Sequence, residues 1–267
     1  MIRITTLIFT LLVFVPAAAY AQADDPGALR LAEPDFTLAA LPTGLRLPLF
    51  RSAFRVTHRF TRPLNDDFGD VASDLFGLDS GAQIGLEYRF GIIPNGQIGF
   101  HRTSNKTIEF FSQYSVLRQT AGHHLDLSGI AMIDGTNNFR DSYSPALGVI
   151  VSRMLGDWVG LYVEPIWVNN SNPLPKQLSD DNNTFLVGLG ARVRVRPSVY
   201  LVGEYLPRTG YTPGVDQGSF AIEKRVGGHM FQLNFSNAFG TTMGEMARGG
   251  PQVNDWYMGF NISRKFF

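Results

Sequence analysis

The chain has 267 residues, with 23 basic residues, 23 acidic residues and no cysteine. The absence of cysteine excludes disulfides, thiol catalysis and cysteine metal ligands, and the balanced charge gives no indication of a nucleic-acid partner. Aromatic residues make up 12% of the chain, which also holds 28 glycines. This composition favours one large β-domain over a string of small ones.

Residues 1–21 are predicted to form a signal peptide that is cleaved on export. Arg3 gives a positive start, an apolar stretch runs from Leu7 to Val15, and residues 19–21 (Ala-Tyr-Ala) are typical of a cleavage site with small residues. An uncleaved membrane anchor is the alternative, but the apolar stretch is much shorter than the roughly 20 residues that a spanning helix needs. We therefore expect the mature chain to begin at Gln22.

Residues 22–48 are spaced by prolines at positions 26, 34, 42 and 48 and show no clear periodic pattern. The segment therefore gives no indication of a strand or of a helix. We predict a periplasmic N-terminal extension, and a plug that enters the lumen of a barrel is the alternative.

Residues 49–267 alternate apolar and polar side chains with a period of two, which is the pattern of β-strands. In the first strand, Phe54 and Val56 share one face, whereas Arg55 and Arg59 share the other. About 12 strands are predicted: a first strand that ends at residue 60, then residues 81–90, 96–103, 107–118, 124–133, 143–154, 158–169, 184–194, 198–206, 218–225, 229–237 and a last strand at 256–267. The pattern predicts an all-β fold, an antiparallel up-and-down transmembrane β-barrel, whose even strand number is typical of bacterial barrels.

The predicted connections alternate between short and long. Short turns rich in Gly, Pro, Asp, Asn and Ser are expected at residues 91–95, 119–123, 155–157, 196–198 and 226–228. Longer polar segments are expected at 61–80, 134–142, 170–183, 207–217 and 238–253, and one short connection near 104–106 breaks the rule. This alternation indicates short periplasmic turns, longer external loops and two periplasmic termini. A soluble secreted β-protein is an alternative interpretation, but such a protein would not show this alternation of short and long connections.

The last strand runs into the carboxyl terminus and ends on Phe266 and Phe267. Such an ending is typical of the closing strand of an outer-membrane barrel. We therefore expect the protein in the outer membrane of a Gram-negative bacterium, with outer-membrane lipid, lipopolysaccharide and the barrel-assembly machinery as its partners. The oligomeric state stays open, because a closed barrel needs no partner to satisfy its edges.

Five short motifs, which occur along the chain in a fixed order, resemble motifs of a known bacterial family. They are His58-Arg59-Phe60, Phe76-Gly77-Leu78-Asp79-Ser80-Gly81-Ala82, Arg102-Thr103-Ser104-Asn105-Lys106-Thr107, Gly228-His229-Met230-Phe231-Gln232-Leu233 and Gly259-Phe260-Asn261-Ile262-Ser263-Arg264. Over roughly residues 45–267 the chain resembles an outer-membrane β-barrel family known as domain of unknown function 5777. The resemblance implies a fold and a location, but the family has no assigned catalytic or ligand-binding residues to carry over.

The side chains on the polar face of the strands are predicted to line the lumen. The candidates are Arg51, Arg55, Arg59, Glu87, Arg89, Glu109, Arg192, Arg194, Glu204 and Lys265. One interpretation is an interior filled by paired charges, because an unpaired charge in a narrow barrel is costly. The other is a narrow channel for small, possibly anionic solutes, in which the arginines of the first strand meet Lys265 across the closing seam as a cationic stripe.

An outer-membrane enzyme that acts on lipid or lipopolysaccharide is the alternative function. His124, Asp126 and Ser128 share one face of a predicted strand, but residues four apart along a strand are separated by about 13 Å, which is too far for a nucleophile and its base. The five histidines form no metal-ligand spacing. We therefore predict no catalytic residue, no metal and no cofactor.

Overall fold

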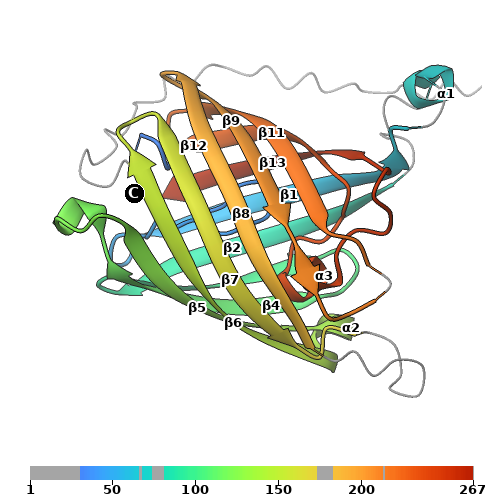
Figure 1. Ribbon diagram of the computed structural model, residues 1–267, viewed down its shortest axis with the longest axis horizontal. Helices are drawn as coiled ribbons and strands as arrows, with labels where there is room; N and C mark the ends of the chain where they lie inside the picture. Colours follow the sequence, from blue (N-terminus) through green and yellow to red (C-terminus); the bar gives the residue numbers. More distant parts are fainter. Residues whose placement is uncertain (1–30, 66–67, 74–80, 173–182, 213, 267) are drawn as a thin grey trace, which may run out of the picture.

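The computed structural model describes residues 31–65, 68–73, 81–172, 183–212 and 214–266. Its main feature is a closed antiparallel barrel of 12 strands, with one additional two-residue strand (Figure 1). The strands follow one another around the barrel in chain order. The predicted fold class is confirmed, whereas the predicted signal peptide at residues 1–21 lies outside the described residues.

The strands carry these bounds: β1 Ser52–Pro63, β2 Ala82–Ile93, β3 Gly96–Thr103, β4 Ile108–Leu117, β5 Asp126–Gly135, β6 Asp141–Leu155, β7 Val159–Asn169, β8 Asn183–Arg196, β9 Val199–Leu206, β10 Arg208–Thr209, β11 Gln217–Val226, β12 His229–Ser236 and β13 Tyr257–Phe266. Three short helices and one 3₁₀ turn lie between them: α1 Phe68–Ser73, η1 Gln119–Ala121, α2 Thr136–Phe139 and α3 Met243–Arg248. Strand β10 pairs only with β8 and stands outside the ring.

Successive side chains on each strand point alternately into the barrel and away from it. On β1, the side chains of Arg55, Thr57 and Arg59 are buried inside the barrel. The outer surface instead exposes large apolar side chains along the strands, such as Phe100 and Phe220. A hydrophobic exterior around a polar interior is the arrangement expected of a barrel in a bilayer.

The barrel closes where β1 meets the last strand. Arg55 pairs with Ser263 and Thr57 pairs with Asn261 in an antiparallel register. The predicted closing strand is therefore confirmed as far as Phe266, and Phe267 lies outside the described residues.

Short turns lie at the end of the barrel where β1 begins, and most of the longer connections lie at the other end. The segment 134–142, predicted as a long loop, is instead a tight turn, because β5 continues to Gly135 and β6 begins at Asp141. Asn137 and Asn138 adopt left-handed backbone conformations there, which asparagine tolerates better than most residues and which allow the chain to reverse within a few residues. Among the helices of the described residues, none is long and apolar enough to cross a membrane.

Two segments fold into the barrel from opposite ends (Figure 1). From the short-turn end, residues 32–45 enter the lumen before β1 begins, and they are buried. From the other end, the connection between β12 and β13 turns inward and carries α3, of which residues 243–247 are buried. The predicted periplasmic extension is therefore wrong for this part of residues 22–48, because wall side chains bind its backbone inside the barrel, as the next section describes.

Candidate functional site in the lumen

The first insert forms a tight hairpin, which we call the N-terminal hairpin (residues 35–43). The backbone N–H of Leu38 donates to the carbonyl of Leu41 at 2.7 Å, and that of Thr43 donates to the carbonyl of Phe36 at 2.8 Å. The tip of the hairpin, residues 38–41, therefore points into the lumen. Its backbone presents a set of N–H and C=O groups that need partners there.

A single carboxylate binds the tip. The side chain of Glu204 on β9 accepts hydrogen bonds from the backbone N–H groups of Ala39, Ala40 and Leu41, at 3.1 to 3.2 Å. Hydrogen bonds to a charged acceptor are stronger than those between neutral groups. Glu204 thus ties the tip to the wall through three successive residues.

Three wall arginines bind the carbonyl and hydroxyl oxygens of the same hairpin. The guanidinium of Arg192 donates to the carbonyl of Thr37 at 2.6 Å, and that of Arg59 donates to the carbonyl of Ala39 at 3.0 Å. Arg55 donates to the side-chain hydroxyl of Thr37. The hairpin therefore supplies acceptors to cations that would otherwise face an open lumen.

Neutral amides on the wall complete the contact. Gln232 donates to the carbonyl of Leu38 at 3.1 Å, Asn261 donates to that of Ala39 at 2.9 Å, and Gln113 donates to that of Thr43 at 2.9 Å. These bonds come from β12, β13 and β4. Together with β1, β8 and β9, these strands bind the hairpin mostly through its backbone.

The two leucines at the base of the tip rest against glycines of β8. A Cβ atom added at Gly190 would lie 2.2 Å from Cδ1 of Leu38, and one added at Gly188 would lie 2.6 Å from Cδ2 of Leu41. A larger residue at either position would force the leucine side chain beside it to move. These glycines therefore make the space that the hairpin occupies.

Ion pairs between wall side chains lie beside the hairpin. Arg192 pairs with Glu223 at 2.8 Å, and both side chains are fully buried. Glu87 pairs with Arg55 at 3.5 Å and with Arg89. Charges buried away from water need such partners, so the wall supports the hairpin contacts with a network of its own.

The second insert, which we call the α3 loop (residues 237–256), binds acidic wall groups. Helix α3 begins with a capping box, in which the Thr242 hydroxyl accepts from the Glu245 N–H and the Glu245 carboxylate accepts from the Thr242 N–H. The backbone N–H of Met243 donates to Glu109 on β4 at 2.5 Å, and the Thr242 hydroxyl donates to Asp134 on β5 at 2.8 Å. The loop therefore offers donors to two carboxylates of the wall, whereas the hairpin binds three arginines and one carboxylate.

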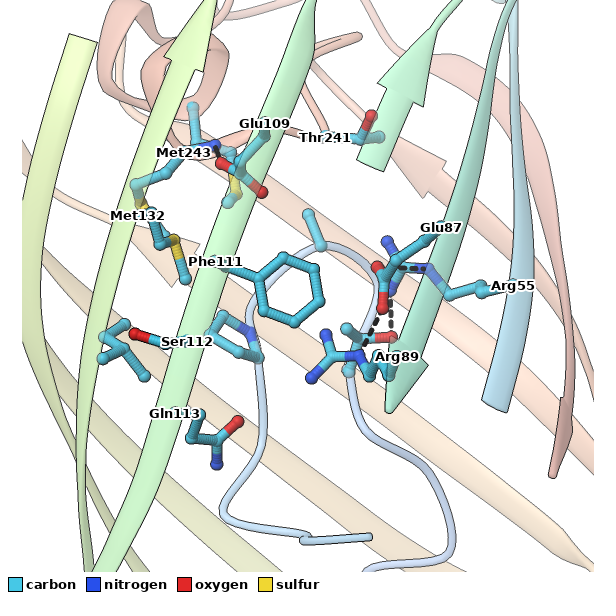
Figure 2. A pocket seen from close by; sticks show the side chains of 15 residues that line it. Arg55, Glu87, Arg89, Glu109, Phe111, Ser112, Gln113, Met132, Thr241 and Met243 are labelled. Carbon is cyan, nitrogen blue, oxygen red and sulfur yellow. Dashed lines mark hydrogen bonds and ion pairs between the residues drawn. The ribbon is translucent and has the colours of Figure 1, made fainter. Parts of the chain in front are cut away.

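The two inserts meet in the middle of the barrel (Figure 2). Ala40 of the hairpin and Met243 and Met246 of α3 belong to one apolar cluster with inward-facing wall residues such as Ile130. A cavity of about 20 Å³ remains between them, lined also by Arg55, Glu87, Arg89 and Glu109. A space of this size holds about one water molecule.

Most of the predicted lumen-lining residues have buried side chains. The buried ones are Arg55, Arg59, Glu87, Arg89, Glu109, Arg192 and Glu204. Arg51 is exposed at the rim, and Arg194 donates to the carbonyl of Pro197 in the neighbouring turn. Lys265 donates to the carbonyl of Pro34 at 2.8 Å.

The arginines of β1 do not form an open cationic stripe, although neither β1 nor β13 carries an acid. Arg55 faces Glu87 on the adjacent strand β2, and Arg59 is hydrogen-bonded to Asn261 and to the hairpin. The prediction considered only the two strands of the seam, whereas a side chain inside a narrow barrel also contacts neighbouring strands and inserted segments.

Sequence reasoning missed Gln113, Gln232 and Asn261 as hairpin partners. Their inward position follows from the period of two, but nothing in the sequence indicates that their amides bind a distant backbone. The α3 loop did carry a signal, because Thr242 followed three residues later by Glu245 is the pattern of a capping box.

The residues of the rejected hydrolase interpretation are not assembled into a site. The Ser128 hydroxyl donates to that of Ser115 at 3.2 Å, while His124 is exposed in the turn before β5. On the outer surface, His58 stacks on Phe260 with ring centres 4.6 Å apart. In the described ranges, no group of three or more His, Cys, Asp or Glu could hold a metal ion.

Most of the chain matches the model of one protein family. Residues 52–266 match the model of the membrane bound beta barrel domain DUF5777. The chain belongs to this family. The matched residues comprise the strands β1 to β13 and the α3 loop, whereas the N-terminal hairpin of this DUF5777 protein precedes the matched region.

Solved structures of outer-membrane proteins are similar to the DUF5777 barrel. The NanC porin has a TM-score of 0.54 at 8% identity, over 81% of this chain and 99% of its own. An outer membrane channel from Pseudomonas putida F1 has a TM-score of 0.49 at 11% identity, over 83% and 97% of the two chains. The outer membrane protein Omp33 of Acinetobacter baumannii has a TM-score of 0.47 at 8% identity, over 81% and 98%. No curated protein matches the sequence.

The DUF5777 chain is thus a membrane-bound β-barrel, and its fold resembles that of an outer-membrane porin. At such low identity the likeness to solved structures concerns the fold alone. It gives no information about the role of the two inserts in the lumen.

Proposed function

We propose that this barrel is a channel for small polar solutes, closed by its N-terminal hairpin and open when the hairpin leaves the lumen. Three observations support the proposal. The hairpin precedes the family's barrel domain, it is bound mainly through its backbone, and it covers charged side chains of the wall, among them three arginines.

The wall groups that the hairpin occupies favour anions. When the hairpin leaves, Arg55, Arg59 and Arg192 each lose an acceptor, whereas one carboxylate, Glu204, loses its donors. Guanidinium groups with unused N–H donors attract anionic solutes. The three arginines are therefore the observation on which the proposed preference rests.

The direct test is single-channel recording in planar bilayers. The full-length mature protein is compared with a variant that lacks residues 22–44, and heat-modifiable migration on gels verifies that both are folded. We expect rare brief openings for the full chain and steady, anion-selective conductance for the shortened one. A folded, shortened barrel with no conductance would contradict the proposal and favour a structural role.

A second variant closes the channel without removing any residue. A Cβ atom at Gly44 would lie 3.9 Å from Cβ of Asp126 on the wall, within the range of about 3.5 to 4.5 Å that a disulfide needs. It would also lie 2.9 Å from the Ser152 hydroxyl, so Ser152→Ala is included with Gly44→Cys and Asp126→Cys. The chain has no other cysteine, and Ser152→Ala alone is the control.

The expected result is a channel that is silent when oxidised and regains the openings of the control when reduced. Equal conductance in both states would mean that the hairpin stays seated while solutes pass, which would overturn its proposed role as the gate.

A further inference from the structure

The outer surface over β3, β4 and β5 carries an apolar trough. Two hollows of about 420 and 400 Å³ share Ile98, Ser112 and Ala131, so they are continuous. Ser112 and Ala131 are exposed and alternate with buried residues that point into the barrel. The trough therefore lies on the surface that faces lipid.

Two small residues form the floor of the trough. Ser112 and Ala131 lie side by side on β4 and β5, next to Ile98 of β3, with larger side chains such as Phe110 and Tyr114 before and after Ser112 on the same face of β4. A Cβ atom added at Gly129 would meet nothing within 4 Å. Along β4 the trough runs from residue 110 to residue 116, about 20 Å at the rise of a strand, which suits one fatty acyl chain.

A cation stands above one end of the trough. Arg102 on β3 is exposed, lies between Leu86 of β2 and Ile108 of β4 in the register, and alternates with buried His101 and Thr103. The Arg102 side chain therefore points outward, toward the apolar, lipid-facing surface of the barrel. The hydrogen bond assigned to it goes to a neutral group, the Asn138 side-chain oxygen, at 3.1 Å.

Two more cations lie on the adjoining turns. The Asn138 N–H donates to the carbonyl of Lys106 at 2.7 Å, which joins α2 to the turn between β3 and β4. Lys106 and Arg140 are exposed on these turns. Asp141, the acid next to Arg140, accepts a hydrogen bond from Asn137. Within the described ranges, Arg102, Lys106 and Arg140 form no ion pair.

Aromatic rings surround this basic corner. Phe110 contacts Phe139 with ring centres 5.1 Å apart, and Phe139 contacts Tyr143 at 5.0 Å. Aromatic rings on the outside of a barrel mark the level of the lipid headgroups. The short turns at the other end face the periplasm by the rule for outer-membrane barrels, so this corner faces the outer leaflet.

We propose that the corner binds lipid A, the phosphorylated and acylated disaccharide that anchors lipopolysaccharide. One acyl chain lies in the trough, and a phosphate accepts hydrogen bonds from Arg102, Lys106 and Arg140. The charge of the corner and its place at the outer leaflet favour a phosphorylated glycolipid over a second copy of the chain or a neutral lipid.

The test measures binding of fluorescent lipid A to the full-length protein in detergent. Arg102→Gln is expected to weaken binding about tenfold, because it removes a charge-assisted hydrogen bond to phosphate. Arg153→Gln is the matched control: Arg153 is also exposed, on the outer face of β6 opposite Leu161, but at the periplasmic end. Equal binding by the wild type and Arg102→Gln, or equal weakening by both variants, would overturn the proposal.

A second variant and three competitors identify the ligand. Gly129→Leu fills open space in the trough and is expected to weaken lipid A binding several-fold. Dephosphorylated lipid A and inorganic phosphate are expected to compete poorly, because each supplies only half of the ligand. Full competition by inorganic phosphate would assign the corner to a free anion, and equal binding of phosphatidylglycerol would assign it to anionic phospholipid in general; either result overturns the proposal.

Discussion

The N-terminal hairpin and the α3 loop fill the same lumen but bind different sets of charged wall groups. The hairpin offers carbonyls to arginines on the wall, whereas the α3 loop offers N–H and O–H donors to Glu109 and Asp134. The hairpin comes before the barrel domain of the family, and the α3 loop is part of it and joins two strands. The hairpin thus covers three arginines and one carboxylate of the wall, and the α3 loop covers two carboxylates.

This difference indicates which insert can act as a gate. The α3 loop is fixed at both ends by strands, and its methionines belong to the apolar cluster in the middle of the barrel. The hairpin is joined to the barrel only through the residues that lead into β1. Its departure would therefore leave the barrel intact and uncover the arginines.

The largest expected effect comes from the glycines that seat the hairpin. Gly188→Val together with Gly190→Val places side chains where Leu38 and Leu41 lie, while valine is well suited to a strand. We expect the hairpin to be expelled and the barrel to conduct steadily in single-channel recordings. Gly203→Val on β9 is the control, because an added Cβ atom meets nothing within 4 Å there. If the double variant stays as silent as the control, the hairpin does not close the channel.

A smaller effect is expected from the carboxylate at the hairpin tip. In Glu204→Gln, a neutral amide replaces the charged acceptor of three backbone N–H groups. Losing a hydrogen bond to a charged group costs about 1.5 to 3 kcal/mol, so the open probability should rise at least about tenfold.

Glu109→Gln is the matched change on the side of the α3 loop, where Glu109 accepts from the Met243 N–H. Single-channel recordings should show no rise in open probability for this variant. Equal opening by both variants would remove the distinction between a movable hairpin and a fixed loop.

The barrel itself could be predicted from the sequence because its signal is carried by side chains. Alternation such as Phe54, Arg55, Val56 along a strand assigns each residue to the lipid or to the lumen. The twelve strands and the closing strand follow from that pattern. The resemblance to the family covered the same residues and therefore supported the same conclusion.

The contents of the lumen could not be predicted in the same way. The hairpin binds through the carbonyls of Thr37, Leu38 and Ala39 and the N–H groups of residues 39–41, which every residue type possesses. The sequence of an aperiodic, proline-spaced segment therefore does not indicate whether the segment lies in the lumen or in the periplasm. Glu204 was recognised as inward-facing, but its partner is 165 residues away in the chain.

The smallest expected effect concerns the cap of α3. Thr242→Ala removes the hydroxyl that accepts from the Glu245 N–H and donates to Asp134, and the loss of such a cap costs about 1 kcal/mol. Thr241→Ala is the control, because the Thr241 hydroxyl is buried with no hydrogen bond to any described residue. Urea unfolding of the barrel in lipid vesicles, followed by tryptophan fluorescence, should show a lower free energy of unfolding for Thr242→Ala alone. Conductance should stay at the wild-type level in both variants, because a loosened α3 loop remains joined to β12 and β13 while the hairpin keeps its own partners; steady conductance of Thr242→Ala would instead make the α3 loop the gate.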